Sequence, residues 1–226
     1  MKPNGYILHE DPYRVAIVTG FSVPSDNRKT GPMVQVWILV KKENPITAVQ
    51  SGTDRLICGS CPHRGNQGQN RSCYVNVGQA PLGIWRAWQS GAYPVLPSPE
   101  IFRGHYVRLG AYGDPTHIPF KLAEAIANYA AGHTGYTHQW RKPTNQPWRD
   151  LVMASVDSTQ EMHIAREMGW GTFRVAKDHD HHKGETLCLS EAKGKTCLEC
   201  QLCNGRKTSI YIPVHGSGAV HFTERN

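Results

Sequence analysis

The sequence predicts a single-domain α/β fold, a partial βα barrel of about six parallel strands. Short β-branched runs alternate with helix-like segments of about 11 residues, which is typical of parallel strands joined by right-handed crossovers. The chain has 226 residues, enough for one well-formed core. A hydrophobic fraction of 39% argues against a disordered chain. We therefore expect residues 1–226 to form one metal-binding α/β domain.

The predicted strands are runs rich in β-branched and aromatic residues. The first parallel strand is the VQVWILV run at residues 34–40. Residues 13–20 add a strand or hairpin within an N-terminal extension, residues 1–33. The other parallel strands are expected at residues 105–112, 134–140, 151–156, 171–176 and 209–214.

The predicted helices lie between these strands. Residues 79–89 place three large apolar side chains on one side, and residues 120–131 end at Gly132. A short helix or turn is expected at residues 146–150. The helix at residues 158–168 begins at Ser158 and has Glu161 three residues later, the spacing of a capping box. The alternation of elements is therefore nearly continuous from residue 34 onward.

Charge and hydropathy limit the partners and the compartment. The net charge of +7 favours an anionic partner such as a nucleic acid or a nucleotide, although the basic residues are scattered and an ordinary basic surface explains them equally well. No stretch is long and apolar enough to cross a membrane, and the N-terminus is too polar for a signal peptide. We expect a cytoplasmic protein, in the host cytoplasm if a phage encodes it. Cysteines there favour metal binding over disulfides.

The first cysteine group lies in a long polar loop at residues 41–78. It contains Cys58, Cys61 and Cys73, which supply three thiolates. Either a histidine such as His63 completes a zinc site, or an iron–sulfur cluster keeps one iron open for another ligand. A structural zinc that fixes the loop is the alternative to a catalytic metal.

The second cysteine group lies in a polar loop at residues 178–207. Its members are Cys188, Cys197, Cys200 and Cys203, and four thiolates suffice for tetrahedral zinc or for an iron–sulfur cluster. The C-x-x-C-x-x-C spacing favours an iron–sulfur cluster of the 4Fe–4S type, with zinc as the alternative. The histidines of the run at residues 177–183, just before this group, are best explained as part of a solvated charged loop.

Sites in parallel α/β folds form where strands end. Both cysteine loops are expected at the carboxyl ends of the strands, together with Gly113, Asp114 and Asp157. Asp114 is a candidate for ligand contact, although the Gly-Asp-Pro turn alone explains it. His138, near the end of a predicted strand, is a candidate acid–base group, and a buried structural histidine is the equal alternative. Walker, GxGxxG, GxSxG and HExxH motifs are missing from the sequence.

Several short motifs occur in a fixed order along most of the chain. They are Asn27-Arg28-Lys29-Thr30-Gly31, the Cys-x-x-Cys-Pro loop that ends in Cys73-Tyr74, Gly113-Asp114-Pro115, Tyr136-Thr137-His138, Cys197-Leu198-Glu199-Cys200-Gln201-Leu202-Cys203 and His215-Gly216. This ordered set resembles an uncharacterised cysteine-rich protein family of phages and prophage-bearing bacteria.

The layout is also similar, more distantly, to radical S-adenosylmethionine enzymes. In that superfamily, three cysteines follow the first strand of a partial barrel, and a short glycine- and acid-containing motif ends the second. The resemblance implies that the first cysteine group holds a cluster with one open iron. It also implies that Gly113 and Asp114 contact S-adenosylmethionine, and that the second group holds an auxiliary cluster. The cysteine spacing here is x2 then x11, where that superfamily has x3 then x2.

These observations lead to two main functional hypotheses. The first is a phage-type iron–sulfur enzyme that acts on an anionic substrate such as a nucleotide or RNA, with Asp114 and His138 lining its cavity. The second is a non-enzymatic zinc-binding protein of phage origin that binds nucleic acid. A third hypothesis is a protein that inhibits a host factor through surface contacts, but no particular residue supports it.

Overall fold

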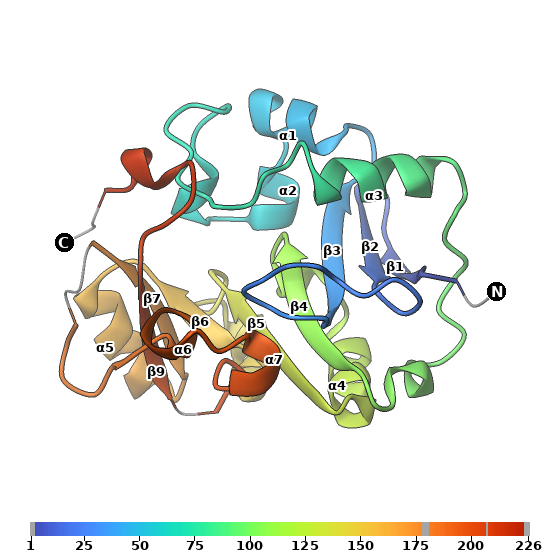
Figure 1. The fold of residues 1–226 in the computed structure, drawn as a ribbon. Helices are drawn as coiled ribbons and strands as arrows, with labels where there is room; N and C mark the ends of the chain where they lie inside the picture. The colour runs from blue at the N-terminus through green and yellow to red at the C-terminus, as the bar shows by residue number, and fades with distance from the viewer. Residues whose placement is uncertain (1–2, 178–180, 207, 224–226) are drawn as a thin grey trace.

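The computed structural model describes residues 3–177, 181–206 and 208–223. Within these residues, nine strands form one mixed, mostly parallel sheet (Figure 1). Its strands are β1 (Gly5–Glu10), β2 (Arg14–Thr19), β3 (Val34–Val40), β4 (Tyr106–Tyr112), β5 (Gly132–Thr137), β6 (Met153–Val156), β7 (Thr172–Ala176), β8 (Thr186–Leu187) and β9 (Ser209–Pro213).

The strands follow one another across the sheet almost in chain order. The order is β1-β2-β3-β4-β5-β6-β7-β9-β8, with β1, β2 and β3 antiparallel and every later pair parallel. The six parallel strands expected from the sequence are present. The sheet does not close into a barrel, because β1 and β8 lie at its opposite edges. An open, mostly parallel sheet is therefore the accurate description of this fold.

The N-terminal extension forms a hairpin that continues the sheet. The expected strand near residues 13–20 is β2, which pairs with β3, and β1 pairs with β2 through a register shift between Ile7 and His9. Strand β5 begins earlier than expected, because the preceding helix ends at Tyr129 and Ala130 is already extended. Strand β5 also ends earlier than expected, at Thr137, so His138 follows directly after the strand instead of lying within it.

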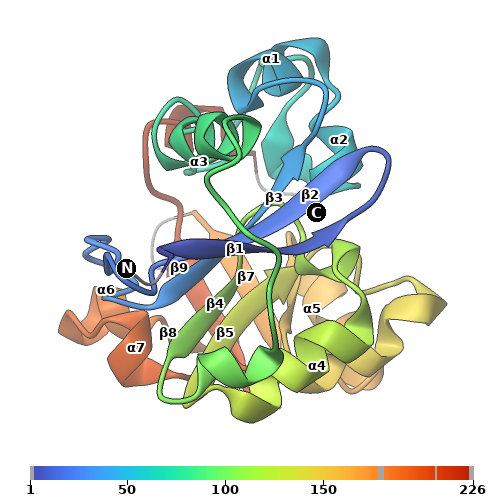
Figure 2. The same ribbon diagram turned by 90° about the vertical axis from the view of Figure 1, so that its right-hand side faces the viewer.

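The helices occupy three positions around the sheet (Figures 1 and 2). Helices α4 and α5 cover one face, and the segment with α6 and α7 lies on the other. Helices α1, α2 and α3 lie beyond the carboxyl end of β3. The helices are α1 (Pro45–Ser51), α2 (Arg55–Cys58), α3 (Ala80–Gln89), α4 (Phe120–Tyr129), α5 (Thr159–Glu167), α6 (Leu189–Lys193) and α7 (Cys197–Cys200).

Short 3₁₀ helices complete the connections. They are η1 (Pro62–Arg64), η2 (Pro99–Phe102), η3 (Pro115–His117), η4 (Pro143–Asp150) and η5 (Ala219–His221). Each of the first four begins with a proline, whose fixed φ suits the first helical position and whose missing amide would be unpaired there anyway. The helix expected at residues 146–150 is the second half of η4.

One large hydrophobic cluster holds the sheet and its helices together. Fully buried side chains from the sheet, such as Ile17, Ile38 and Leu109, share this cluster with Ile126 of α4 and with Trp140. A second, smaller cluster contains Met153, Cys203 and Ile210. No helix in the described part of the chain combines the length and the apolar character that a membrane crossing requires.

Candidate metal centres

The first cysteine group is assembled by the loop between β3 and α3. Cys58 ends helix α2. In the turn that follows, the amide of Cys61 donates a hydrogen bond to the carbonyl of Cys58 at 3.2 Å. The chain then returns, so that the amide of Cys73 donates to the carbonyl of His63 at 2.9 Å. All three cysteines carry free thiols.

The three thiols are close enough to influence one another. Burial raises the pKa of Cys58 well above its ordinary value, and the neighbouring Cys61 and Cys73 raise it further. Burial also raises the pKa of Cys73, against the opposing effect of the Arg71 guanidinium. Arg71 donates to the carbonyls of Cys73 and Val75, at 3.0 and 2.9 Å, which places a cation beside the group. The raised pKa values keep Cys58 and Cys73 protonated without metal, so metal binding by these two thiols would release protons.

Asp114 joins three elements at the carboxyl edge of the sheet. Its carboxylate accepts hydrogen bonds from the amide and hydroxyl of Thr116, from the Thr137 hydroxyl through both oxygens, and from the amide of His138, all between 2.8 and 3.0 Å. Its own amide donates to the carbonyl of Ile57 at 2.7 Å. These bonds give Asp114 a positioning role. The expected contact with a cofactor stays a prediction.

Gly113 lies against the end of β3. Its φ of +81° is in the left-handed region, and a Cβ atom there would stand 2.8 Å from the Cβ of Ile38. Glycine is therefore required for close packing of the β4 end on β3. Because this packing already explains the residue, the role of Gly113 in cofactor binding also stays a prediction.

His138 connects the first cysteine group to the end of β6. Its Nε2 lies 3.9 Å from Cys61 Sγ and 3.3 Å from Asp157 Oδ1. Burial by itself lowers the pKa of His138, but the neighbouring Cys61 and Asp157 outweigh it and raise that pKa well above its ordinary value. Asp114 and His138 therefore lie near Cys61 at this edge, but neither is among the residues that line the cavity there, as had been expected of both.

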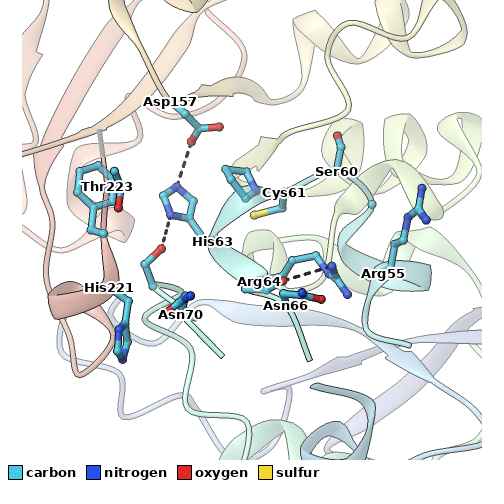
Figure 3. A pocket seen from close by; sticks show the side chains of 15 residues that line it. Arg55, Ser60, Cys61, His63, Arg64, Asn66, Asn70, Asp157, His221 and Thr223 are labelled. Carbon is cyan, nitrogen blue, oxygen red and sulfur yellow. Dashed lines mark hydrogen bonds and ion pairs between the residues drawn. The ribbon is translucent and has the colours of Figure 1, made fainter. Parts of the chain in front are cut away.

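Two residues outside the expected site set complete this edge. His63 Nε2 lies 3.0 Å from Asp157 Oδ1, and His63 Nδ1 lies 2.9 Å from Ser72 Oγ (Figure 3). Although burial raises the pKa of Asp157, the His138 and His63 imidazoles outweigh it and hold that pKa below its ordinary value. Asp157 is predicted at a strand end and His63 is predicted as a possible fourth ligand of the first cysteine group. The structure adds that the two side chains lie 3.0 Å apart.

A cavity of about 470 Å³ opens beside this edge (Figure 3). His63, Asp157 and Cys61 line it, and Arg55, Asn66 and Asn70 add polar and basic groups. Arg55 is exposed, whereas Arg64, also in the wall, is bound to Asp54 with 2.5 Å between Nη2 and Oδ1. The cavity therefore combines candidate metal ligands with hydrogen-bond donors for an anion.

The four cysteines of the second group also come together. Burial raises the pKa values of Cys188, Cys197 and Cys203, and neighbouring thiols of the group raise these three pKa values further. Helix α7 carries Cys197 and Cys200, and it begins with a complete capping box between Thr196 and Glu199. The motif Thr-x-x-Glu at this place was a readable sequence signal for a helix start.

Three other segments hold the second group in place. The amide of Cys197 donates to the carbonyl of Lys29, in the N-terminal Asn-Arg-Lys-Thr-Gly motif, at 2.8 Å. The amide of Cys188 donates to the carbonyl of Tyr211 in β9, and the Cys203 carbonyl accepts from the amide of Gly135 in β5, both at 2.9 Å. The second group thus ties the N-terminal extension to the sheet.

The second group does not lie at the carboxyl ends of the strands, so that expectation is wrong. Cys203 and Cys188 pack with Met153 and Ile210, which stand at or next to the beginnings of β6 and β9. After β8, which pairs with β9 at the edge of the sheet, the segment with α6 and α7 lies over one face of the sheet (Figure 2). Within the described residues, the two cysteine groups therefore lie at different places on the sheet and do not share one rim.

The histidine run before the second group is only partly described. His179 lies outside the described residues. The ring of His181 stacks on Tyr211 with centroids 5.7 Å apart, and His182 Nε2 lies 2.7 Å from the hydroxyl of Thr159. These two contacts are with Tyr211 and Thr159 and not with the cysteines. The loop boundaries 178 and 207 also fall outside the described residues.

One group of possible metal ligands is more tightly spaced than the cysteines. Among the described residues, His63, His138 and Asp157 form the group whose three ligand atoms all lie within 4.8 Å of one another, and neither cysteine group has such spacing. For the cysteine groups, an iron–sulfur cluster and a zinc ion both stay predictions.

Comparison with known proteins does not add a relative. No protein-family model matches the chain, and no curated protein or solved structure is significantly similar to it.

Proposed function

We propose that this protein is a phage-type iron–sulfur enzyme of radical-S-adenosylmethionine-like architecture that acts on an anionic substrate such as a nucleotide or RNA. One observation carries the proposal: the thiols of Cys58, Cys61 and Cys73 gather beside a cavity at the carboxyl edge of six parallel strands. Three thiolates hold a four-iron cluster and leave one iron without a protein sulfur.

The surroundings of the first cysteine group support a cluster. A thiolate-bound cluster carries negative charge, and the Arg71 guanidinium offsets part of it from a position fixed by two carbonyl groups. Cys61 lines the cavity, so the cluster would border the space that a substrate enters.

The cavity supports an anionic substrate. Arg55 is exposed in its wall, and the Asn66 and Asn70 side chains supply further hydrogen-bond donors. The net charge of the chain, +7, also attracts anions over a longer range. A nucleotide or a short RNA segment suits both features, since each presents phosphate oxygens to cations and amide groups.

The protein's own residues would position the reactants. A cluster held by Cys58, Cys61 and Cys73 would supply one-electron chemistry: with an electron from an external reductant, it would allow reductive cleavage of S-adenosylmethionine and removal of a hydrogen atom from the substrate. Asp114 fixes the backbone of His138 and the end of α2, and so fixes the cavity wall around Cys61. Arg55 would bind the anionic part of the substrate.

The second cysteine group is proposed to hold an auxiliary metal centre. Its four thiolates can close the coordination of a cluster, and its place over the face of the sheet joins the N-terminal extension to β5 and β9. A closed site of this kind stabilises the fold and offers no position for a substrate.

Metal analysis tests the proposal. Full-length protein purified without oxygen after iron supply should be brown and carry several irons per chain. Cys58→Ser with Cys73→Ser should remove the iron of the first centre and leave that of the second. A colourless protein that contains only zinc would refute the iron–sulfur assignment. Formation of 5′-deoxyadenosine by the reduced protein tests S-adenosylmethionine cleavage separately, and its absence from an iron-loaded protein would refute that step alone.

The alternative function is a non-enzymatic zinc protein that binds nucleic acid. The basic charge of the chain favours it, and the four thiolates of the second group suffice for a tetrahedral zinc ion. It predicts zinc in the purified protein and an affinity for DNA or RNA that falls steeply with salt. Binding that barely changes between low and high salt would remove its support.

A further inference from the structure

We propose that His63, His138 and Asp157 form a binding site for a divalent first-row transition metal in the wall of the cavity, separate from the cysteine thiols. The three side chains come from three elements: His63 from η1, His138 from the residue after β5, and Asp157 from the residue after β6. Two imidazoles and one carboxylate are the ligand set of mononuclear iron(II) and of catalytic zinc sites. This inference does not depend on an iron–sulfur cluster.

The distances between the ligand atoms match a shared metal ion. Asp157 Oδ1 lies 3.0 Å from His63 Nε2 and 3.3 Å from His138 Nε2. Metal bonds of about 2.1 Å, at angles between octahedral and tetrahedral values, place neighbouring ligand atoms about 3.0 to 3.4 Å apart. The observed distances fall within this range.

The buried His63 Nε2 faces the Asp157 carboxylate. The two atoms lie 3.0 Å apart as an ion pair, but the N–H direction is not aligned for a regular hydrogen bond. When the imidazole is neutral with its proton on Nδ1, both atoms present lone pairs to the same point. A metal ion bound there would accept both lone pairs.

Residues around the site hold its ligands in the required orientation. The Ser72 hydroxyl lies 2.9 Å from His63 Nδ1, and in the tautomer whose Nε2 is free for metal it would accept the Nδ1 proton. The amide of Asp157 donates to the Glu161 carboxylate at 2.8 Å, and the amide of His138 donates to Asp114 at 3.0 Å. Such supporting hydrogen bonds are characteristic of metal sites in proteins.

The position of the site gives a bound metal access to solvent. The side chains of His63, His138 and Asp157 are 14%, 16% and 8% exposed, and two of them, His63 and Asp157, line the cavity. Three protein ligands leave coordination positions for water or for an oxygen of a bound molecule. Cys61 Sγ, 3.9 Å from His138 Nε2, is the point where this site and the first cysteine group meet.

Cobalt(II) binding tests the site directly. Full-length protein is prepared without oxygen, loaded with iron and sulfide, freed of loosely bound metal by a weak chelator, and titrated with Co²⁺ in a calorimeter. We expect one equivalent to bind. Asp157→Asn and His63→Ala should each weaken binding by more than about 100-fold, and Ser72→Ala by roughly 10- to 100-fold. His163→Ala, a change of an exposed histidine on α5, is the matched control and should leave the affinity unchanged.

A second arm separates this site from the thiols. In the Cys58→Ser, Cys73→Ser protein, Co²⁺ should still bind with a visible spectrum that lacks thiolate-to-cobalt charge transfer. Circular dichroism and thermal melting show whether each variant is folded. Equal Co²⁺ affinity in wild type, Asp157→Asn and His63→Ala would overturn the inference, as would binding that disappears only with the cysteines. If the protein binds iron but shows no Co²⁺ site, only this inference is refuted. If it shows the Co²⁺ site but binds no iron, only the iron–sulfur proposal is refuted.

Discussion

Arg108 donates a hydrogen bond to the hydroxyl of Tyr74, and this contact joins the surroundings of the two cysteine groups. Tyr74 follows Cys73 of the first group, and Arg108, in β4, is also an electrostatic neighbour of Cys197 in the second. The Arg108 residue is only 8% exposed and forms no salt bridge with a carboxylate among the described residues. Burial lowers its pKa, but Tyr74, Tyr136 and Cys197 outweigh this and raise the pKa above its ordinary value.

A buried cation beside a cysteine group is explained if the thiols there bind metal as thiolates. We therefore expect Arg108→Met, which keeps the length and removes the charge, to speed the loss of metal from the second centre to a chelator by about 10-fold. The first centre should keep its metal. Arg103→Met, at an exposed arginine near the start of the same strand, is the control. Metal release rates that do not differ between the two variants would show that Arg108 does not act on the second centre.

The packing of Gly113 on β3 can be tested with a matched glycine. Gly113→Ala places a Cβ 2.8 Å from the Cβ of Ile38, whereas Gly91, with a similar φ of +76°, has no atom within 4 Å of the same position. Both substitutions bear the cost of a left-handed backbone, about 1 kcal/mol, but only Gly113→Ala adds overpacking of about 1–3 kcal/mol. Urea unfolding of both variants measures the difference. Equal losses of stability would contradict the close approach seen here.

Much of the fold was predictable because the parallel strands are buried and continuous. The run from Val34 to Val40 is nearly all apolar, as a strand covered on both faces must be, and its boundaries were predicted without error. Strand β1 was missed because its alternation is weak and its pairing with β2 contains a register shift. Strand β8 has two residues and exists only through its pairing with β9. No local pattern can reveal such an element.

The part of the candidate site that lies at strand ends was predictable from the sequence. The position of residues in long loops was not. Asp114, His138 and Asp157 lie near one another because consecutive parallel strands end at the same edge, a rule that needs no structure. The second cysteine group obeys a different constraint, since its loop folds back over the sheet and is held by the carbonyl of Lys29. Contacts between residues more than 160 positions apart carry no local sequence signal.

A buried ion pair secures the edge of the sheet near the second cysteine group. Arg174 in β7 binds Glu185 through two hydrogen bonds, Nε to Oε1 at 2.9 Å and Nη2 to Oε2 at 2.6 Å, and the two side chains are 4% and 0% exposed. Glu185→Gln removes the negative charge that faces the buried guanidinium and weakens both hydrogen bonds. We expect it to lower the free energy of unfolding by about 1.5–3 kcal/mol, measured with urea. Glu124→Gln, at a surface ion pair with Lys121, should cost less than about 1 kcal/mol.

The same pair should make the stability of the protein depend on acid. Burial raises the pKa of Glu185, but the hydrogen bond from Arg174 and the amide of His182 outweigh it and lower that pKa below the ordinary value of 4.5. Because the folded state then binds fewer protons than the unfolded state, this stabilisation is complete above about pH 4.5 and is lost as the pH falls further. Unfolding free energies measured between pH 7 and pH 3 should therefore decline more in the wild type than in Glu185→Gln, which has no carboxyl to protonate. Parallel declines in the two proteins would show that other groups cause the loss of stability in acid.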